Sequence, residues 1–230
     1  MRLVIGFGNK ARHGKDGAAL SMIDHLESKR AVAKHHNYPV RTPNVLKIGF
    51  ADALRRESSA AISKACGIGR LLENGFRDDV SGSWVDIPAW VTEDPNPEMG
   101  LPLLPFGKHS KLLQWWGTEY RRNQNQNYWV DQVEQQIVGF EGLVLITDVR
   151  FLNEAALVKK LGGYTVNVTR LNEDGTLFAD PTRPATHVSE TALDGYNWDF
   201  YIKVKNGDQA LKSEYAITLL EHLLALRGNS

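Results

Sequence analysis

Residues 1–17, MRLVIGFGNKARHGKDG, decide the fold class of this chain. The apolar run at residues 3–7 predicts a short buried strand, and the pattern that follows predicts a helix over residues 15–29. Glycine and basic residues form the turn between them. In a phosphate-binding loop, backbone N–H groups and a helix N-terminus converge on an anion, and a lysine, here Lys15, adds a positive charge. The stretch therefore predicts a loop that binds phosphate.

The loop differs from the usual phosphate-loop pattern in two places. The pattern has glycine five residues before Gly14, where Asn9 stands, and it has Ser or Thr after the lysine, where Asp16 stands and Gly17 follows. Asn tolerates left-handed backbone geometry, so Asn9 can replace the glycine. The helix dipole favours a carboxylate in the first turn, and a carboxylate can hold Mg²⁺, so we expect Asp16 to face a metal. The competing interpretation of the basic residues 10–15 is a solvated turn.

The rest of the chain predicts a doubly wound α/β fold in a single domain over residues 1–230. Short apolar runs predict five buried parallel strands, at residues 3–7, 45–50, 143–147, 164–169 and 200–204. Helical patterns lie at residues 15–29, 52–66, 108–122, 128–138, 151–161 and 208–226. Most strands lead into a helix, which is the alternation expected of a parallel sheet with helices on both faces.

Two segments interrupt this alternation. An inserted segment at about residues 70–107 is rich in proline and glycine from residue 74 onward and carries Trp84 and Trp90, which we expect to be exposed. It is expected to form a functional loop or a small subdomain. Residues 171–187 are polar and follow a strand end, so we expect them to form a lid, because ligands of open α/β sheets bind beyond the carboxyl ends of the strands.

Composition excludes several classes of protein. Lys plus Arg and Asp plus Glu balance at 27 each, so no global basic field favours stable nucleic-acid binding. The single cysteine, Cys66, excludes an internal disulfide and a cysteine-built zinc site, and we expect it to be buried in a helix. No apolar stretch approaches the roughly 20 residues that span a bilayer, and the N-terminal run is too short for a signal peptide. We therefore expect a soluble cytoplasmic protein without a membrane partner.

A second constellation lies at the end of the strand predicted at residues 143–147. Nucleotide-binding folds place a carboxylate that positions Mg²⁺ after such a strand, and Asp148 stands there. Arg150 can bind a phosphate through two hydrogen bonds or fix Asp148. The alternative is that Asp148 caps the following helix, which contains Glu154.

Three further groups of residues suit an acceptor nucleotide less specifically. The aromatic and arginine residues at 115–122, with Trp129, suit a nucleobase and its phosphate, and a helix that buries Trp116 while its arginines meet solvent is an equal alternative. Asp52 and Arg55 follow a strand and suit either helix capping or phosphate binding. His187 and Glu190 form a weak metal or acid–base pair, and capping of a short helix by Thr186 or Ser189 is the favoured alternative.

Taken together and in this order, these segments resemble the deoxynucleoside monophosphate kinases of tailed bacteriophages, a branch of the P-loop kinases. The likeness covers nearly the whole chain except residues 70–107. An acid after the loop lysine is a mark of this family, so Asp16 agrees with it. Two departures remain: Asn9 stands in place of a glycine, and Gly17 stands where the family usually has Thr or Ser. The residues that carry the likeness are 10–16, 50–55, Gly117, Thr118, Arg121, Trp129, Val130, 147–150, Glu154 and 186–190.

The resemblance implies a three-layer P-loop kinase fold and the reaction of ATP–Mg²⁺ with a deoxynucleoside monophosphate to give ADP and the diphosphate. It implies that Lys15, Asp16, Arg121, Asp148 and Arg150 are catalytic, with Asp16 and Asp148 at the metal. The residues expected to bind ATP are Asn9, Lys10, Ala11, Arg12, His13, Gly14, Lys15, Asp16, Gly17 and Arg170. The residues expected to bind the acceptor are Asp52, Arg55, Trp116, Gly117, Thr118, Arg121, Trp129, Arg150, Glu154 and Arg183.

Other functions remain open at this point. One is another P-loop small-molecule kinase of the phosphomevalonate type, although the aromatic region at residues 115–129 suits a base better than an isoprenoid. A second is a non-catalytic nucleotide-binding regulator that has lost the hydroxyl at position 17. A structural or nucleic-acid-binding module is disfavoured by the zero net charge. A homodimer is compatible with the sequence.

Overall fold

The computed structural model describes residues 2–39, 42–92, 109–180 and 186–228. The chain divides into two compact units. The sheet unit consists of Met1–Phe50 and Val133–Ser230, and the helical unit consists of Ala51–Gln132. The prediction of one domain over residues 1–230 stays a prediction.

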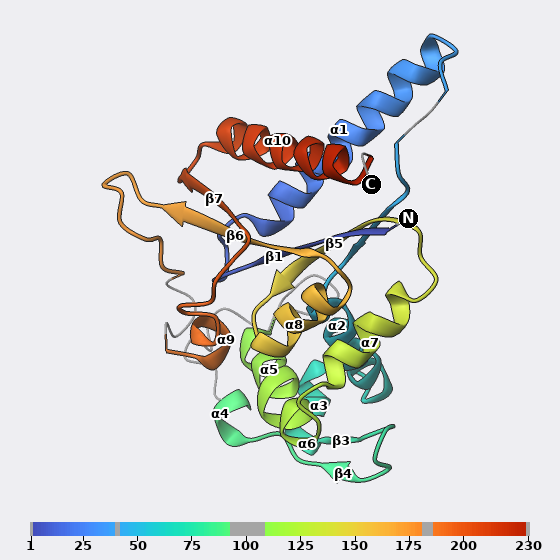
Figure 1. The fold of residues 1–230 in the computed structure, drawn as a ribbon. Coiled ribbons are helices and arrows are strands. Elements are labelled where there is room, and N and C mark those ends of the chain that lie inside the picture. The colour runs from blue at the N-terminus through green and yellow to red at the C-terminus, as the bar shows by residue number, and fades with distance from the viewer. Residues whose placement is uncertain (1, 40–41, 93–108, 181–185, 229–230) are drawn as a thin grey trace. The chain divides into compact units, whose positions relative to one another are not determined.

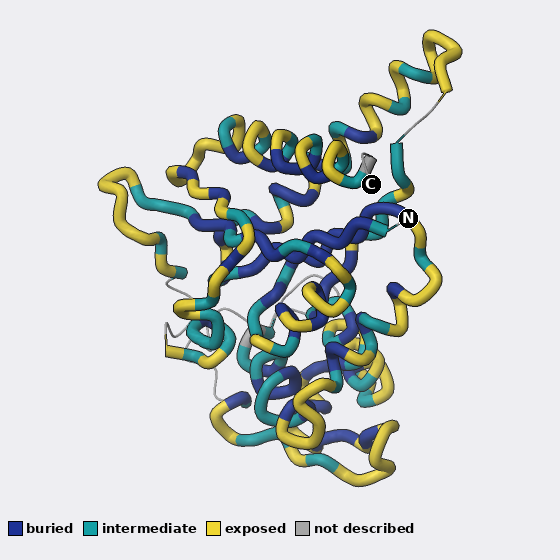
Figure 2. The backbone as a smooth tube through the Cα atoms, viewed as in Figure 1, coloured by how far each residue is buried: buried dark blue, intermediate teal, exposed yellow. Residues whose placement is uncertain are grey.

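The sheet unit is built on a five-stranded parallel sheet, which confirms all five predicted strands (Figure 1). The strand order is β2-β5-β1-β6-β7, so β1 is central. The strands are β1 (Arg2–Gly8), β2 (Val45–Ile48), β5 (Gly142–Val149), β6 (Tyr164–Leu171) and β7 (Phe200–Lys205). The central strands are apolar on both faces and buried, as expected for a parallel sheet that is covered on both sides (Figure 2).

Helices cover the two faces of this sheet. Helices α1 (Lys15–His35) and α10 (Gln209–Gly228) pack together on one face, and α8 (Leu152–Lys160) lies on the other (Figure 1). Because the chain leaves β1 toward one face and β5 toward the other, the carboxyl ends of these neighbouring strands form a topological switch point. Gly8 at the end of β1 pairs with Val149 at the end of β5, so the loop after β1 begins at that point.

Gly8 is required there by a close approach. A Cβ atom on this residue would lie 2.1 Å from Cη2 of Trp198, a buried side chain that precedes β7. The glycine thus lets the indole pack directly on the end of β1.

The helical unit contains most of the elements that the sequence did not predict. Its elements are α2 (Phe50–Lys64), α3 (Ile68–Asn74), the antiparallel pair β3 (Phe76–Arg77) and β4 (Trp84–Val85), α4 (Ala89–Thr92), α5 (Ser110–Gln114), the π-helical turn η2 (Trp115–Tyr120), α6 (Arg121–Gln124) and α7 (Tyr128–Ile137). The predicted helices over 52–66, 108–122 and 128–138 are confirmed, but the middle of the second is a π-helix. Trp84 and Trp90 are exposed as expected, and residues 93–107 of the inserted segment lie outside the described residues.

The prediction for Cys66 is wrong. Helix α2 ends at Lys64, and Cys66 lies exposed in the turn that follows, with a φ of 61°. A left-handed residue commonly ends a helix, and here the N–H of Gly67 donates back to the carbonyl of Ile62 at 2.9 Å.

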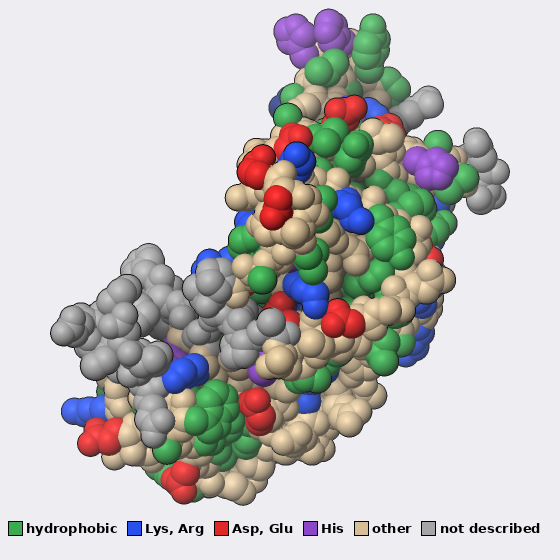
Figure 3. Space-filling model, turned by 90° about the vertical axis from the view of Figure 1, so that its left-hand side faces the viewer, with side chains coloured by type: hydrophobic (Ala, Val, Ile, Leu, Met, Phe, Trp, Pro, Cys, Tyr) green, Lys and Arg blue, Asp and Glu red, His purple; other side chains and the backbone are tan. Residues whose placement is uncertain are grey.

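On the face drawn in Figure 3, acidic and basic side chains of the described residues are interspersed, in keeping with the zero net charge. No helix in the described parts of the chain combines the length and apolar character needed to cross a bilayer.

Candidate functional site

The turn between β1 and α1 is shaped by three residues with positive φ. These residues are Asn9 at 98°, Arg12 at 57° and Gly14 at 91°. The expected left-handed geometry of Asn9 is therefore confirmed. The Asn9 side chain also fastens the turn to β6, since its Nδ2 donates to Oγ1 of Thr169 at 3.0 Å and to Oδ1 of Asn167 at 3.2 Å.

His13 holds the other end of this turn. It is buried, its Nε2 lies 3.0 Å from the carbonyl oxygen of Phe178, and its Nδ1 accepts from the backbone N–H of Arg170 at 3.3 Å. Burial lowers the pKa of His13 to about 4, so the ring is neutral at physiological pH. The two contacts then require the proton on Nε2. His13 thus anchors the turn to the end of β6.

Lys15 is folded back over the turn. Only 6% of the residue is exposed, and its Nζ donates to the carbonyl oxygens of Asn9 at 3.1 Å and Lys10 at 2.5 Å. Burial, followed by the positive charge of Arg150, lowers the pKa of Lys15 to about 7, although the charges of Glu190, Asp148 and Asp16 act to raise it. Within the described residues, no carboxylate lies within 4 Å of this ammonium group. Lys15 is therefore a buried cation whose direct partners are neutral.

The first turn of α1 adds unsatisfied donors beside this lysine. Gly14 is the N-cap and supplies no side chain, and the first N–H with a backbone acceptor is that of Ala18, which donates to Gly14 at 3.0 Å. In the described part of the chain, the N–H groups of Lys15, Asp16 and Gly17 have no protein acceptor. Such donors and the positive end of the helix dipole favour an anion.

Glu190 braces the turn from outside. It is buried in the short helix α9 (Val188–Thr191) and accepts from the N–H of Ala11 at 2.8 Å and from Nη1 of Arg150 at 2.5 Å. Lys10 donates to the carbonyl of Glu190 at 2.8 Å and to Asp194 at 2.9 Å. The arginine predicted to bind phosphate is thus ion-paired, and Glu190, which the sequence offered only in a weak pair, holds the loop in place.

The structure corrects the expected cap of α9. The N-cap is His187, whose Nδ1 accepts from the N–H of Ser189 at 3.2 Å, rather than Thr186 or Ser189. This short helix therefore forms where the alternative interpretation placed it, but with a different capping residue.

Asp16 and Asp148 are the expected metal ligands, and both already have polar partners. Asp16 is largely exposed and pairs with Nζ of Lys47 at 3.0 Å. Burial acts to raise the pKa of Asp16, but the hydrogen bonds with Lys47 and Thr147 and the charges of Lys47 and Lys15 hold it below its ordinary value. Asp16 is therefore ionised at neutral pH.

Asp148 accepts from the N–H of Phe50 at 2.8 Å, a bond within the sheet unit. Just before α8, the side chain of Glu154, which is buried, accepts from the N–H groups of Arg150 at 2.6 Å and Phe151 at 3.1 Å. Among the described residues, no group of three or more Asp, Glu, His or Cys side chains is arranged to hold a metal. Two carboxylates still fit Mg²⁺, which commonly takes its other oxygens from phosphates and water.

Arg170 and Arg12 lie near the segment predicted to be a lid. The guanidinium of Arg170 lies 3.2 Å from the centre of the Phe178 ring, and Arg12 pairs with the buried Asp180 at 3.2 Å. Burial, and then the charge of Arg12, lower the pKa of Arg170. Arg183 lies outside the described residues.

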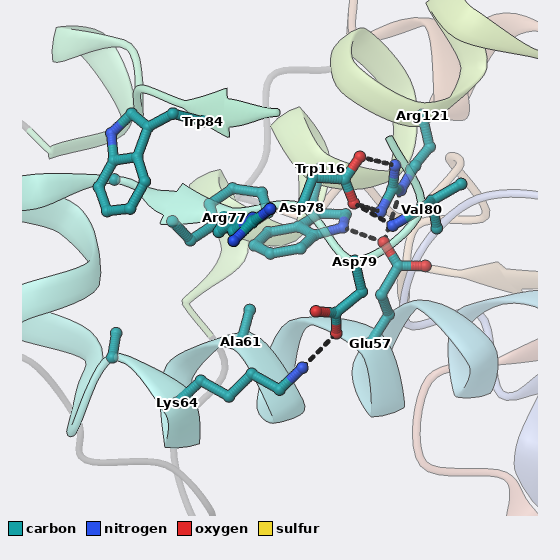
Figure 4. Close-up of a pocket in the computed structure, with 13 residues that line it drawn as sticks. Glu57, Ala61, Lys64, Arg77, Asp78, Asp79, Val80, Trp84, Trp116 and Arg121 are labelled. Carbon is teal, nitrogen blue, oxygen red and sulfur yellow. Dashed lines mark hydrogen bonds and ion pairs between the residues drawn. The ribbon is translucent and has the colours of Figure 1, made fainter. Parts of the chain in front are cut away.

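In the helical unit, Arg121 is enclosed by acids (Figure 4). Only 1% of it is exposed, and it donates to Asp78 at 2.9 Å through Nη1 and to Glu57 at 2.5 Å through Nε. Tyr120 also donates to Asp78 and Tyr128 to Glu57, at 2.8 and 2.7 Å. Burial opposes these charges, but the hydrogen bonds with Arg121 hold the pKa of Asp78 far below its ordinary value, and those with Asp78 and Glu57 raise the pKa of Arg121.

The neighbouring residues predicted to bind the acceptor are also packed in this unit. Trp116 donates to Glu57 at 2.8 Å and stacks on Phe76, with 4.3 Å between ring centres. Trp129 is buried and donates to the carbonyl of Gly117 at 2.9 Å. A Cβ on Gly117 would lie 2.8 Å from Cδ2 of Leu54, so the glycine permits close helix packing.

The alternative interpretation, in which the helix buries Trp116, is thus correct for the tryptophan, whereas its two arginines are buried instead of meeting solvent. Thr118 is half-buried. Asp52 and Arg55 form an exposed pair at 2.8 Å. A cavity of about 330 Å³ opens beside Phe76, Trp84 and Trp116, with Lys64 and Asp79 paired at its edge (Figure 4). The roles of all these residues in acceptor binding stay predictions.

Comparison with known proteins adds no identification: no protein-family model matches the chain, and no curated protein matches it significantly.

Proposed function

We propose that the protein is a nucleotide kinase of the P-loop type, which transfers the γ-phosphoryl group of ATP to a deoxynucleoside 5′-monophosphate. One observation carries the proposal. The ammonium group of Lys15 is buried against neutral carbonyls, beside the unsatisfied N–H groups at the start of α1. A buried cation is costly unless it meets an opposite charge, and the triphosphate of ATP supplies one.

The position of this loop in the fold supports the same proposal. It follows the central strand β1 at the switch point with β5, where open α/β sheets bind their ligands, and Asp148 lies in β5 near its carboxyl end. Asp16 and Asp148 would hold Mg²⁺, which supplies charge neutralisation on the phosphates. The lid over residues 171–187, with Arg170 and Arg183, belongs to the proposal as the part that excludes water.

Phosphoryl transfer requires little covalent chemistry from the protein. It requires two substrates held in line and a field that stabilises the charge of the moving phosphoryl group. The loop N–H groups and Lys15 provide that field for the donor. The choice of a deoxynucleoside monophosphate as acceptor rests on the resemblance of residues 117–130, 147–150 and 186–190 to the bacteriophage enzymes.

A coupled assay of ADP release tests the reaction. Purified protein with ATP and Mg²⁺ is offered each deoxynucleoside monophosphate, each ribonucleoside monophosphate and, as a separate arm, a phosphorylated isoprenoid alcohol. We expect turnover with at least one deoxynucleoside monophosphate, and its loss in Lys15→Met with the fold retained. ATP binding without turnover on any acceptor would favour the regulator, and turnover on the isoprenoid alone would favour the other kinase class.

A further inference from the structure

Lys212 brings a second buried ammonium group to the start of α1. The residue lies in the first turn of α10 and is 6% exposed. Its side chain lies over the two glycines of the loop and of the first helical turn. A Cβ atom would lie 2.6 Å from Nζ of Lys212 if placed on Gly17, and 3.4 Å from it if placed on Gly14. The ammonium therefore occupies space that exists only because residue 17 has no side chain.

The surroundings of Lys212 do not balance its charge. Its Nζ donates to the neutral Oε1 of Gln209, and in the described part of the chain no carboxylate lies within 4 Å of it. Asp208, which directly precedes the helix, accepts from the N–H of Leu211 at 3.0 Å. Burial lowers the pKa of Lys212, and no opposing charge raises it.

The helix dipoles make this position less favourable still. Lys212 belongs to the first turn of α10 and lies against the first turn of α1, so two positive helix ends face one cation. Basic residues stabilise the last turn of a helix and not the first. Packing alone gives no reason for an ammonium group here, since an apolar side chain of similar length would fill the same space.

We infer that Lys212 binds the phosphate chain of the nucleotide at the first turn of α1, from the space that the side chain at position 17 fills in the resembled family. The inference rests on the proposed function, because it assigns Lys212 to the same triphosphate. It also gives Gly17 a structural reason. The glycine is a requirement of this arrangement, because any side chain at position 17 displaces the lysine.

Binding measurements on four proteins test the inference without any need for turnover. Calorimetric titration with ATP, tripolyphosphate and adenosine is carried out on the wild type, Lys212→Met, Gly17→Thr and the double variant. We expect Lys212→Met to weaken ATP and tripolyphosphate at least tenfold, with adenosine unaffected. Lys203→Met, which removes an exposed lysine from β7, is the matched control and should bind as the wild type does.

Gly17→Thr gives the sharper result. Restoring the family's side chain is expected to weaken ATP at least tenfold, because the new Cβ displaces Nζ of Lys212. The double variant should bind no more weakly than Lys212→Met alone, since both changes remove one contact. The unfolding midpoint of Lys212→Met without ligand should equal or exceed that of the wild type, which separates a binding role from a structural one.

The outcomes separate the inference from the proposed function. Wild-type affinity for ATP in Lys212→Met overturns the inference and leaves the kinase proposal standing, as does tighter binding in Gly17→Thr. Weakened ATP binding in a protein that turns over no acceptor supports the inference while the kinase reaction fails. If the wild type binds neither ATP nor tripolyphosphate, both are overturned.

Discussion

The two units bury cations in opposite ways. In the helical unit, Arg121 lies between the carboxylates of Asp78 and Glu57. In the sheet unit, Lys15 and Lys212 are nearly as buried, but their direct partners are backbone carbonyls and a side-chain amide. All three are positively charged residues in helical segments, and only Lys15 stands in a recognisable sequence motif.

The difference between these cations separates structure from binding. A buried ion pair with its hydrogen bonds satisfied holds its elements together, and removing one partner leaves an uncompensated charge. A buried cation beside neutral oxygens is unfavourable in the empty protein and is stabilised when an anion arrives. The central claim is therefore that Arg121 stabilises the fold, whereas Lys15 and Lys212 serve a ligand.

Removal of Arg121 should have the largest effect on stability. Arg121→Met leaves Asp78 buried without its cation, so we expect a loss of about 3–5 kcal/mol in the free energy of unfolding. Urea denaturation followed by circular dichroism measures it. The control is Arg55→Met in the exposed pair with Asp52, for which we expect less than about 0.5 kcal/mol. Equal losses in both variants would contradict the structural role of Arg121.

The pH dependence of stability should differ between the two units. The pKa of Asp78 is lowered in the folded state, so its contribution is present above its unfolded pKa and is lost as pH falls into the acid range. The pKa of Lys15 is about 7 when folded and 10.5 when unfolded, so the unfolded chain binds the extra proton between these values and stability rises with pH there.

Single substitutions show which residue causes each change of stability with pH. We expect Arg121→Met to flatten the acid slope and Lys15→Met to remove a rise of up to about 1.4 kcal/mol per pH unit between pH 7 and 10. Unfolding free energies measured from pH 2 to 10 in each variant, minus those of the wild type, give the result. An unchanged alkaline slope in Lys15→Met would show that its ammonium is not desolvated.

Neutralising Glu190 should have an intermediate effect. Glu190→Gln keeps an acceptor for the N–H of Ala11 but removes the charge that faces Arg150, so we expect a loss of about 1–3 kcal/mol. The matched control is Glu221→Gln, which removes the charge from an exposed carboxylate that pairs with Lys29 and His25. Denaturation midpoints that fall equally in both variants would remove Glu190 from its role as the brace of the loop.

The smallest effect is expected for the glycine variant of Asn9, compared with the alanine variant. Because its φ is 98°, Asn9→Ala combines backbone strain with the loss of the bond to Thr169, and we expect a cost of about 1–3 kcal/mol. Asn9→Gly removes the same bond without strain and should cost no more than about 1 kcal/mol. Thermal denaturation of the two variants measures this difference in stability. A glycine variant less stable than the alanine variant would contradict the positive φ of Asn9.

The sheet was predictable because its strands are local signals. Each buried parallel strand is a continuous apolar run, and the helices between them carry their own periodicity. The elements that escaped prediction are α3, α4, the short pair β3 and β4, and the π-helical turn. They are too short for a periodic pattern, and they lie in or beside the segment rich in proline and glycine.

The candidate site was only half predictable for a related reason. Residues 9–17 are contiguous, so the loop and Lys15 are visible as a motif. Lys212 reaches Gly17 from the far end of the chain, and Asp78 reaches Arg121 from an irregular segment. Nothing in the sequence links these pairs. The exposure of Cys66 was also not predictable, because the sequence does not fix the exact residue at which α2 ends, and Cys66 lies just beyond that end.

The most direct test of the central claim is the stabilisation that ATP gives to Lys15→Met and to Arg121→Met, measured as the rise in unfolding free energy with Mg²⁺ present. At 100 times the dissociation constant, ATP should stabilise the wild type by about 2.7 kcal/mol. We expect Lys15→Met without ligand to be at least as stable as the wild type and to lose this rise. Arg121→Met should start several kcal/mol lower and keep it. A Lys15→Met protein that ATP stabilises as it does the wild type would contradict the account.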